Sequence, residues 1–228
     1  MSSFNKAAFI DFILDNGVVG FFERPVTLKS GRTSNWYVNW RTVSGDAFLI
    51  DMLSDFLISF TEDLGFEPDS FYGVPEGASK IGVLSTLKRA KARPDFSPGR
   101  YALPMGRGKP KEHGDPKDRY FLTPPEGNII VVEDVTTTGG SLISALESLK
   151  YLDAKVLAAV GLTSRMELRD DGTSVKDALA EMGVEYHALS CAEEFLPAAF
   201  KKFSPGEAMG RAIEKEFERY GENPLKLL

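Results

Sequence analysis

The chain has 228 residues, of which 43% are hydrophobic and 26% are charged, a composition typical of water-soluble globular proteins. This length is enough for one domain with a sizeable core. The formal charge of -6 and the isoelectric point near 5.1 argue against nucleic-acid-binding and anionic-membrane-binding proteins, because those need a basic face. We therefore expect no nucleic acid partner, and a locally basic site for any anionic substrate.

The cysteine content and the first residues bear on where the protein works. One cysteine, Cys191, excludes an internal disulfide and a cysteine-based zinc site, and is typical of a reducing compartment. Residues 1–6 contain no basic segment followed by an apolar one, so we expect no signal peptide. No apolar run approaches the ~20 residues that a membrane helix needs. The expected protein is cytoplasmic and makes no membrane contact.

The N-terminal elements come first in chain order. Residues 4–16 carry apolar side chains at helical spacing and predict a helix that stops at Gly17. After a polar turn at 29–34, apolar and polar side chains alternate over 36–41, which is the period of a strand. We expect residues up to about 45 to form a small helix-and-strand hood on the larger domain.

From residue 46 onward, predicted helices alternate with short apolar strands. The helices are expected at 46–63, 79–91, 140–152, 174–182 and 204–220, the last opened by a capping box at Ser204 with Pro205 at the first helical position. The strands are expected at 70–74, 100–105, 128–132, 156–162 and 184–189. This alternation predicts an α/β fold, a parallel twisted sheet flanked by helices. We expect a single domain over residues 1–228, with its core and C-terminal helix in 46–228.

The segment 129–141 is the most informative one for function. An apolar strand ends in Glu133 and Asp134, passes through a turn rich in threonine and glycine, and enters a helix. Parallel sheets bind ligands at the carboxyl ends of their strands. Glycines let backbone N–H groups approach an anion, and a helix start offers unpaired donors and a positive dipole end. With two carboxylates placed to hold vicinal hydroxyls, the segment predicts a site for ribose 5-phosphate.

Other interpretations of 129–141 are weaker. One alternative is that the threonines and glycines only cap a helix, but two adjacent carboxylates at the end of a buried strand are costly without partners. No Gly-Lys-Ser/Thr follows, as a Walker A loop requires, and the Gly-x-Gly-x-x-Gly pattern of nicotinamide-binding proteins is missing from the segment. A sugar phosphate is therefore the expected ligand.

Residues 131–141 resemble the phosphoribosyl pyrophosphate (PRPP) signature of type I phosphoribosyltransferases. Segments that are similar to orotate phosphoribosyltransferases lie at 27–32 with 37–39, 73–80, 107–114 and 164–169. The resemblance implies a type I phosphoribosyltransferase fold and the Mg²⁺-dependent reaction of orotate with PRPP, which gives orotidine 5-phosphate and pyrophosphate in de novo pyrimidine (UMP) biosynthesis. It also implies a homodimer in which the mobile loop of one subunit reaches the neighbour's site.

The resemblance also implies roles for individual residues. The implied catalytic residues are Arg107, Lys111, His113 and Asp134. The implied PRPP contacts are Lys29, Lys80, Arg107, Lys111, His113, Glu133, Asp134, Val135, Thr136, Thr137, Thr138, Gly139, Gly140 and Ser141. The implied orotate contacts are Lys29, Tyr37, Val38, Thr137 and Arg165. Mg²⁺ is implied as an ion bound through the PRPP diphosphate, so no dedicated metal ligands are expected.

The sequence departs from the family pattern at two places. Arg107 is followed by Gly108, so that the usual loop lysine is displaced to Lys109. The two-aromatic strand reads Tyr37-Val38, or Trp36-Tyr37 if the register is shifted by one residue. A phosphoribosyltransferase for another nucleobase therefore stays an alternative. A non-catalytic PRPP-binding regulator is a second alternative, although residues 1–26 are too short and insufficiently basic for a DNA-binding domain.

Some of these residues also have purely structural interpretations. The charged loop 106–119 is compatible with a solvated surface loop, Arg165 with a simple ion pair to Glu167, and Lys29 with a plain turn residue. The residues that we interpret as structural are Trp36, Trp40, His187 and Cys191.

Overall fold

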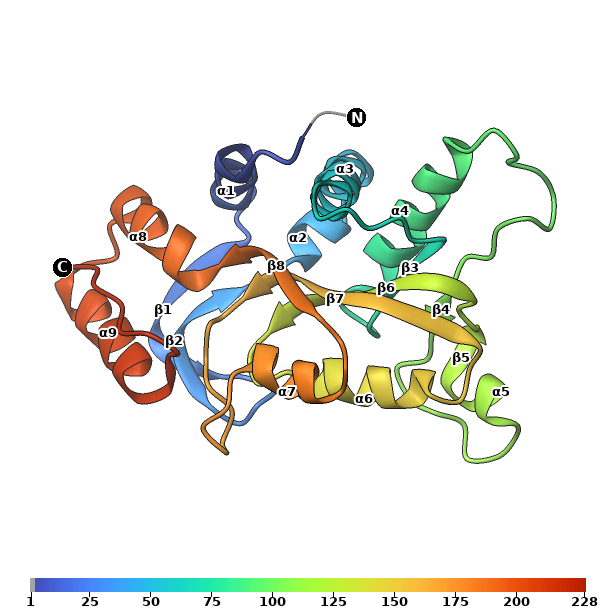
Figure 1. Cartoon of the computed structure of the whole chain (residues 1–228). Helices are drawn as coiled ribbons and strands as arrows, with labels where there is room; N and C mark the ends of the chain where they lie inside the picture. Colours follow the sequence, from blue (N-terminus) through green and yellow to red (C-terminus); the bar gives the residue numbers. More distant parts are fainter. Residues whose placement is uncertain (1–2) are drawn as a thin grey trace.

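A parallel sheet of four strands lies at the centre of the molecule (Figure 1). The computed structural model describes residues 3–228, so the first two residues of the predicted hood lie outside the described residues. The strands are β3 (Ser70–Gly73), β6 (Gly127–Thr136), β7 (Ala154–Ser164) and β8 (Tyr186–Cys191), in the order β3-β6-β7-β8. Each neighbouring pair is parallel, so the carboxyl ends of the strands meet at one edge of the sheet.

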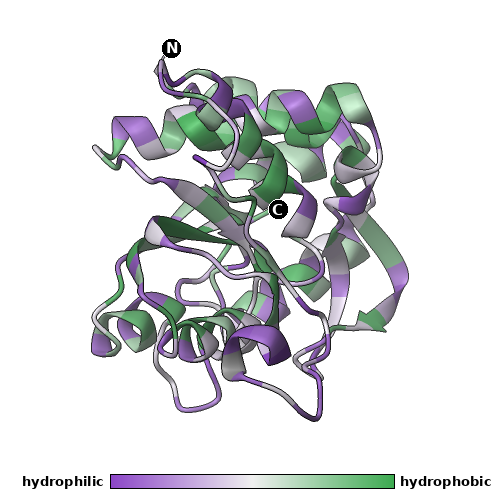
Figure 2. Cartoon of the chain, turned by 90° about the vertical axis from the view of Figure 1, so that its right-hand side faces the viewer, coloured by the Kyte–Doolittle hydropathy of each residue, from purple (hydrophilic) through white to green (hydrophobic). Residues whose placement is uncertain are grey.

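Helices cover both faces of this sheet (Figure 1). One face carries α1 (Lys6–Asp15), α3 (Ala47–Asp63), α4 (Ser79–Lys91) and α8 (Ala192–Phe203), and the other carries α6 (Gly140–Leu149) and α7 (Val175–Glu181). Figure 2 shows hydrophobic and hydrophilic bands alternating along these helices, as expected when one stripe of each faces a core. The predicted α/β class, a parallel sheet flanked by helices, is confirmed.

The central strand β6 is buried on both of its faces. Ile130 and Val132 belong to the core cluster under α1, α3 and α4, whereas Ile129 and Val131 belong to the cluster under α6 and α7. All these side chains are fully buried. Because successive side chains of a strand point to opposite faces, a strand covered on both sides becomes a continuous apolar run. This is why the segment 128–132 was recognisable as a strand.

The N-terminal hood is a two-stranded antiparallel sheet that packs against the C-terminal helices. Strand β1 (Val19–Thr27) pairs with β2 (Thr33–Val38), with a register shift between Phe21 and Val26. The buried Trp36 of β2 stacks on Phe217 of α9 (Glu207–Tyr220), with ring centroids 6.2 Å apart. The β1–β2 hairpin and helix α9 therefore pack together beside the sheet (Figure 1).

A small ribbon and a short helix lie at the opposite end of the molecule. Strand β4 (Met105–Gly106) pairs antiparallel with β5 (Phe121–Thr123), and α5 (Pro116–Tyr120) lies between them in the chain. A short helix, α2 (Arg41–Ser44), connects the hood to α3. Within residues 3–228, no helix has both the length and the apolar character that a membrane crossing requires.

Several predicted elements have different bounds in the structure. The strand expected at 100–105 is reduced to β4, because residues 101–103 are largely exposed and Pro104 has no N–H to donate to a ladder. The strand expected at 36–41 is β2, which ends at Val38 before the turn into α2. The strand expected at 128–132 continues to Thr136, so that Glu133 and Asp134 lie within β6.

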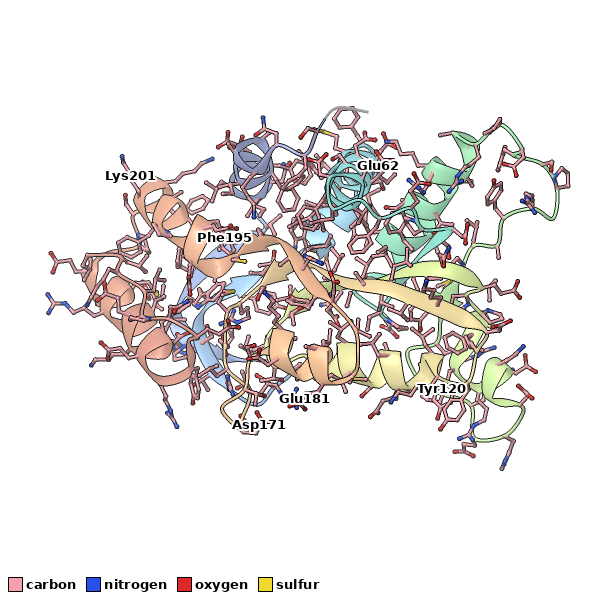
Figure 3. All side chains as sticks on the ribbon, viewed as in Figure 1. Glu62, Tyr120, Asp171, Glu181, Phe195 and Lys201 are labelled. Atoms are coloured by element: carbon pink, nitrogen blue, oxygen red, sulfur yellow. The ribbon has the colours of Figure 1, made fainter. Side chains whose placement is uncertain are left out.

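The C-terminal prediction was wrong in one helix boundary and missed one helix. Ser204 is the C-cap of α8, with φ of 46°, and α9 begins only at Glu207, after Gly206. Helix α8 itself was not predicted, because Pro197 interrupts its pattern with a residue that usually breaks helices. Figure 3 shows its buried Phe195 within the molecule, while Lys201 of the same helix lies at the surface.

Candidate active site

The segment expected to bind phosphate lies where β6 passes into α6, at the carboxyl edge of the sheet. Gly139 is the N-cap of α6 and has φ of 72°, a conformation that favours glycine. A Cβ at this position would also lie only 2.9 Å from Val175. The turn therefore presents the backbone N–H groups at the start of α6 to the solvent side of the sheet.

Two adjoining cavities, of about 580 and 400 Å³, form a cleft over this turn. We call them the phosphate cavity and the base cavity. Both are lined by Lys29, Pro75, Gly108, Glu133, Val135, Thr137 and Ser141. The phosphate cavity is also lined by Thr136, Thr138, Gly139, Gly140, Tyr72, Tyr120, Arg107, Pro110, Ser144 and Ser148. The base cavity is also lined by Tyr37, Val38, Asn39, Arg41, Glu76, Gly77, Asp134 and Arg165.

Two adjacent carboxyl groups lie between the cavities and have different environments. Glu133 is only 7% exposed, and its burial raises its pKa well above the usual value, with the charge of Asp134 acting in the same direction. The charge of Lys29 opposes this rise. Asp134 is more exposed and packs so closely on Gly77 that a Cβ on this glycine would clash with the carboxylate. The pair thus offers one buried carboxyl group and one open to the base cavity.

Lys29 connects the hood to the start of α6. Its Nζ donates a hydrogen bond to Ser141 Oγ over 2.7 Å. The turn that carries it is closed by backbone bonds from Gly31 N to Leu28 O and from Leu28 N to Arg32 O. The position of Lys29 in the lining of both cavities places its ammonium group between the sugar-phosphate and the base sides of the cleft.

Arg165 begins the segment that follows β7 and is 1% exposed. Its backbone N–H donates to the carbonyl of Thr136, which brings the ends of β6 and β7 together. The guanidinium forms an ion pair with Glu167, with 2.7 Å between Nε and Oε1, and it also borders the base cavity. The sequence left two alternatives for Arg165, an ion pair with Glu167 and a position at the ligand site. In the structure Arg165 forms the ion pair and also borders the base cavity.

Three of the residues expected to contact PRPP lie away from the two cavities. Lys80 donates through Nζ to the carbonyl of Ser44 over 3.0 Å and lines neither cavity. Lys111 and His113 are exposed on the loop after β4 and line neither cavity. Arg107, from the same loop, does line the phosphate cavity, with its Nε donating to the carbonyls of Asp118 and Phe121 over 3.1 Å.

The loop contains a glycine that departs from the family pattern, and the structure gives a steric reason for it. A Cβ on Gly108 would clash with the carboxylate of Glu76, and one on Gly106 would clash with the Tyr72 hydroxyl. The loop therefore lies directly on the 75–77 turn. Glu76 and Gly77 were missed as individual site residues, although the similarity of segment 73–80 pointed to their position.

No protein-family profile matches the chain. The orotate phosphoribosyltransferase of Bradyrhizobium sp. (strain ORS 278) is 35% identical over 176 residues, which cover 75% of this chain and 88% of that protein. The chain belongs to the orotate phosphoribosyltransferase family.

Solved structures of orotate phosphoribosyltransferases share the fold. The enzyme of Aeropyrum pernix has a TM-score of 0.63 and 25% identity, covering 87% of this chain and 99% of that one. The Mycobacterium tuberculosis enzyme, solved in complex with PRPP, has a TM-score of 0.55 and 19% identity, and covers 83% of this chain and 98% of that one. The resemblance that the sequence motifs indicated is confirmed at the level of the family.

Proposed function

We propose that this chain transfers ribose 5-phosphate from PRPP to orotate and releases orotidine 5-phosphate and pyrophosphate, as a step of pyrimidine (UMP) biosynthesis. The observation that carries this proposal is the cleft itself. It joins a phosphate-binding turn and a pair of carboxyl groups on one side to Tyr37, Val38 and a buried arginine on the other. Family membership supports the same reaction.

The 5-phosphate of PRPP is assigned to the turn from Thr136 to Ser141. Backbone N–H groups at the start of α6 and the hydroxyls of Thr137, Thr138 and Ser141 are the donors, and the helix dipole favours the negative charge. Val135 and Gly139 line this phosphate site with their backbone. A residue larger than glycine at 139 would prevent the backbone from approaching the phosphate closely. In this proposal the turn fixes the sugar without reacting with it.

The ribose hydroxyls are assigned to Glu133 and Asp134. Asp134, open to the base cavity, accepts hydrogen bonds from the ribose diol, and the more buried Glu133 supports it from inside the strand. As the bond between the anomeric carbon and the diphosphate breaks, its electron pair leaves with pyrophosphate; a bond from that carbon to a ring nitrogen of orotate forms, and the proton of that nitrogen is released to pyrophosphate or water. Positive charge develops on the sugar, so the negative carboxylate stabilises the transition state electrostatically.

The departing pyrophosphate and the base need cationic partners. Arg107, Lys111 and His113 are assigned to the pyrophosphate when the loop closes, with Lys29 and Lys80 as further candidates for contacts with diphosphate or base. Loop closure would also exclude water from the reactive sugar. The orotate is assigned to Lys29, Tyr37, Val38 and Thr137, with its carboxylate on Arg165, because arginine suits planar carboxylates.

In this proposal Mg²⁺ binds together with the substrate PRPP. Among residues 3–228 there is no group of three His, Cys, Asp or Glu side chains arranged to hold an ion. We assign the ion to the diphosphate oxygens of PRPP and to water, which are the ligands that Mg²⁺ commonly keeps. When bound, the ion would supply positive charge that neutralises the leaving pyrophosphate.

The decisive experiment mixes purified protein, PRPP and Mg²⁺ with orotate and follows the orotate absorbance. Parallel reactions contain uracil, adenine or hypoxanthine. PRPP-dependent loss of the orotate signal together with pyrophosphate release supports the proposal. Turnover of another base instead would keep the sugar site and overturn the assignments of orotate. No turnover of any base, together with PRPP binding measured by calorimetry, would favour a non-catalytic PRPP-binding regulator.

Assembly as a homodimer with a shared loop is a further part of the proposal. Lys111 and His113 line neither cavity of their own chain, as expected if they serve a neighbouring site. Inactive Lys111→Ala and Arg165→Ala proteins, once mixed, should then regain part of the activity. If subunit exchange is demonstrated and no activity returns, the loop works within its own subunit.

We place the enzyme in the cytoplasm, where a single free cysteine is ordinary.

A further inference from the structure

The guanidinium of Arg165 is held by hydrogen bonds on three of its nitrogens. Nε donates to Glu167 Oε1 over 2.7 Å and Nη2 donates to Ser34 Oγ over 3.0 Å. Nη1 lies 3.4 Å from the carbonyl oxygen of Trp36. A guanidinium has five N–H groups, so these contacts leave one on each terminal nitrogen. This buried residue also borders the base cavity.

The plane of this guanidinium is fixed from one side by a tryptophan. The Arg165 Cζ atom lies 3.6 Å from the centroid of the Trp36 ring, and the same ring stacks on Phe217 of α9. Such cation–π contacts are stronger when they are removed from water, as here, where both side chains are buried. The arginine therefore cannot turn about its own axis without losing this contact.

The ion-pair partner of Arg165 is itself immobilised. Glu167 uses its second oxygen, Oε2, to accept a hydrogen bond from Arg32 Nη1 over 3.0 Å. Arg32 is in turn paired with Asp170 over 2.7 Å and lies over the ring of Tyr220, 4.5 Å from its centroid. Because its two oxygens bind two different arginines, Glu167 cannot follow Arg165 into another rotamer.

A second carboxylate acts from the C-terminal helix. Glu216 of α9 accepts hydrogen bonds from the Ser34 hydroxyl over 2.7 Å and from the backbone N–H of Asn35 over 2.6 Å. It also lies 4.0 Å from Arg165 Nη2. The hood strand, the C-terminal helix and the segment after β7 thus converge on one guanidinium.

We propose that Glu167 and Glu216 are positioning residues, which hold Arg165 with its two remaining N–H groups directed at the carboxylate of the base. This inference rests on the proposed function and explains how a fully buried arginine can serve it. Two-point recognition of a carboxylate requires a guanidinium of fixed plane and direction. Each hydrogen bond from the guanidinium to a glutamate or serine excludes other orientations of Arg165. Less conformational entropy of this side chain is therefore lost when the base binds.

The test is the kinetics of Glu167→Gln, which retains the shape of the side chain and removes its charge. We expect the KM for orotate to rise about tenfold, a coupling within the usual range for residues in one hydrogen-bonded network. The KM for PRPP and kcat should stay within about twofold, because the sugar-phosphate turn is not touched. A general loss of folding would instead lower the active fraction without this selective change.

Glu62→Gln is the matched control. Glu62 on α3 (Figure 3) pairs with Arg89, another buried arginine, over 2.9 Å, and neither residue lines the cleft. This variant is expected to lose stability while keeping both KM values. If Glu167→Gln raises neither KM, or raises the two KM values equally, the positioning role is overturned.

Glu216→Gln keeps the inference testable if Glu167→Gln does not fold. Its side chain is 15% exposed and lies farther from the guanidinium, so we expect a smaller rise, about threefold, in the KM for orotate alone. An unchanged KM for orotate in a folded Glu216→Gln protein would then overturn the inference. If the wild-type protein turns over another base but not orotate, the proposed function itself is overturned. This result is distinct from an unchanged KM for orotate in either variant.

Discussion

Lys29 Nζ donates to Ser141 Oγ over 2.7 Å, although the two residues are 112 positions apart in the chain. This hydrogen bond joins the turn of the hood to the first turn of α6. It places an ammonium group where the phosphate and base cavities meet, so the cleft is built by two distant parts of the sequence.

Replacement of Lys29 by alanine should raise the KM for PRPP about tenfold, because a lost hydrogen bond to a charged group costs about 1.5 kcal/mol or more. Stability should change by no more than about 0.5 kcal/mol, since the side chain is exposed. Steady-state kinetics and urea unfolding measure the two effects. Lys155→Ala, an exposed lysine outside the cleft, is the control. An unchanged KM for PRPP in Lys29→Ala would remove Lys29 from the site.

Asp134→Asn should lower kcat/KM about hundredfold, as expected when a group that stabilises developing charge is neutralised. The fold should be intact, because asparagine has the same shape. Kinetics with PRPP and orotate, together with circular dichroism, test this. A kcat/KM close to that of the wild type would contradict the assignment of the ribose diol to Asp134.

Gly77→Ala should have an effect similar to that of Asp134→Asn without a change at the carboxylate itself. The added Cβ would clash with the Asp134 side chain and displace it from the base cavity. Gly20→Ala, where the new Cβ meets only ordinary contacts at 3.9 Å, is the matched control for a glycine substitution. Full activity of Gly77→Ala would show that the carboxylate is not needed in its present place.

Glu133 should contribute a loss of stability as the pH rises. Burial, and then the charge of Asp134, raise the pKa of Glu133 well above its usual 4.5. The folded protein therefore binds this proton more tightly than the unfolded chain, so ionisation costs stability as pH rises from about 4.5 through the raised value.

Glu133→Gln should remove this dependence, so its stability relative to the wild type should increase as the pH rises above about 4.5 in urea unfolding. Glu147→Gln, on the exposed face of α6, is the control. A stability difference that does not vary with pH would argue against a buried Glu133 carboxyl with a raised pKa.

Cys191 should react slowly with alkylating agents in the native protein. Burial, and then the charge of Glu194, raise the pKa of its thiol from 9.0 to about 11. At a fixed pH this lowers the population of the reactive thiolate about hundredfold. Native and urea-unfolded protein can be compared by mass spectrometry after iodoacetamide treatment, with Cys191→Ser as the blank. Equal rates in the two states would contradict the prediction.

The sequence alone was sufficient for the features that depend on neighbours in the chain. The short continuous apolar run before Glu133 indicated a strand covered on both faces, and the glycines after it indicated a turn into a helix. The fold class and the family followed from such local patterns. Helix α8 and the start of α9 were not predicted correctly, because Pro197 and Ser204 carry local signals that tertiary packing overrides.

Only the tertiary structure decided how the candidate site residues relate to one another. It brought Lys29 to Ser141, left Lys80 at the carbonyl of Ser44, and placed Lys111 outside both cavities. It also surrounded Arg165 with partners from β2 and α9, which no spacing in the sequence reveals. Local sequence determines which elements form, because hydrogen bonding and side-chain periodicity act over a few residues. The direction and partners of a buried side chain depend on which distant elements pack around it, and folding alone settles this.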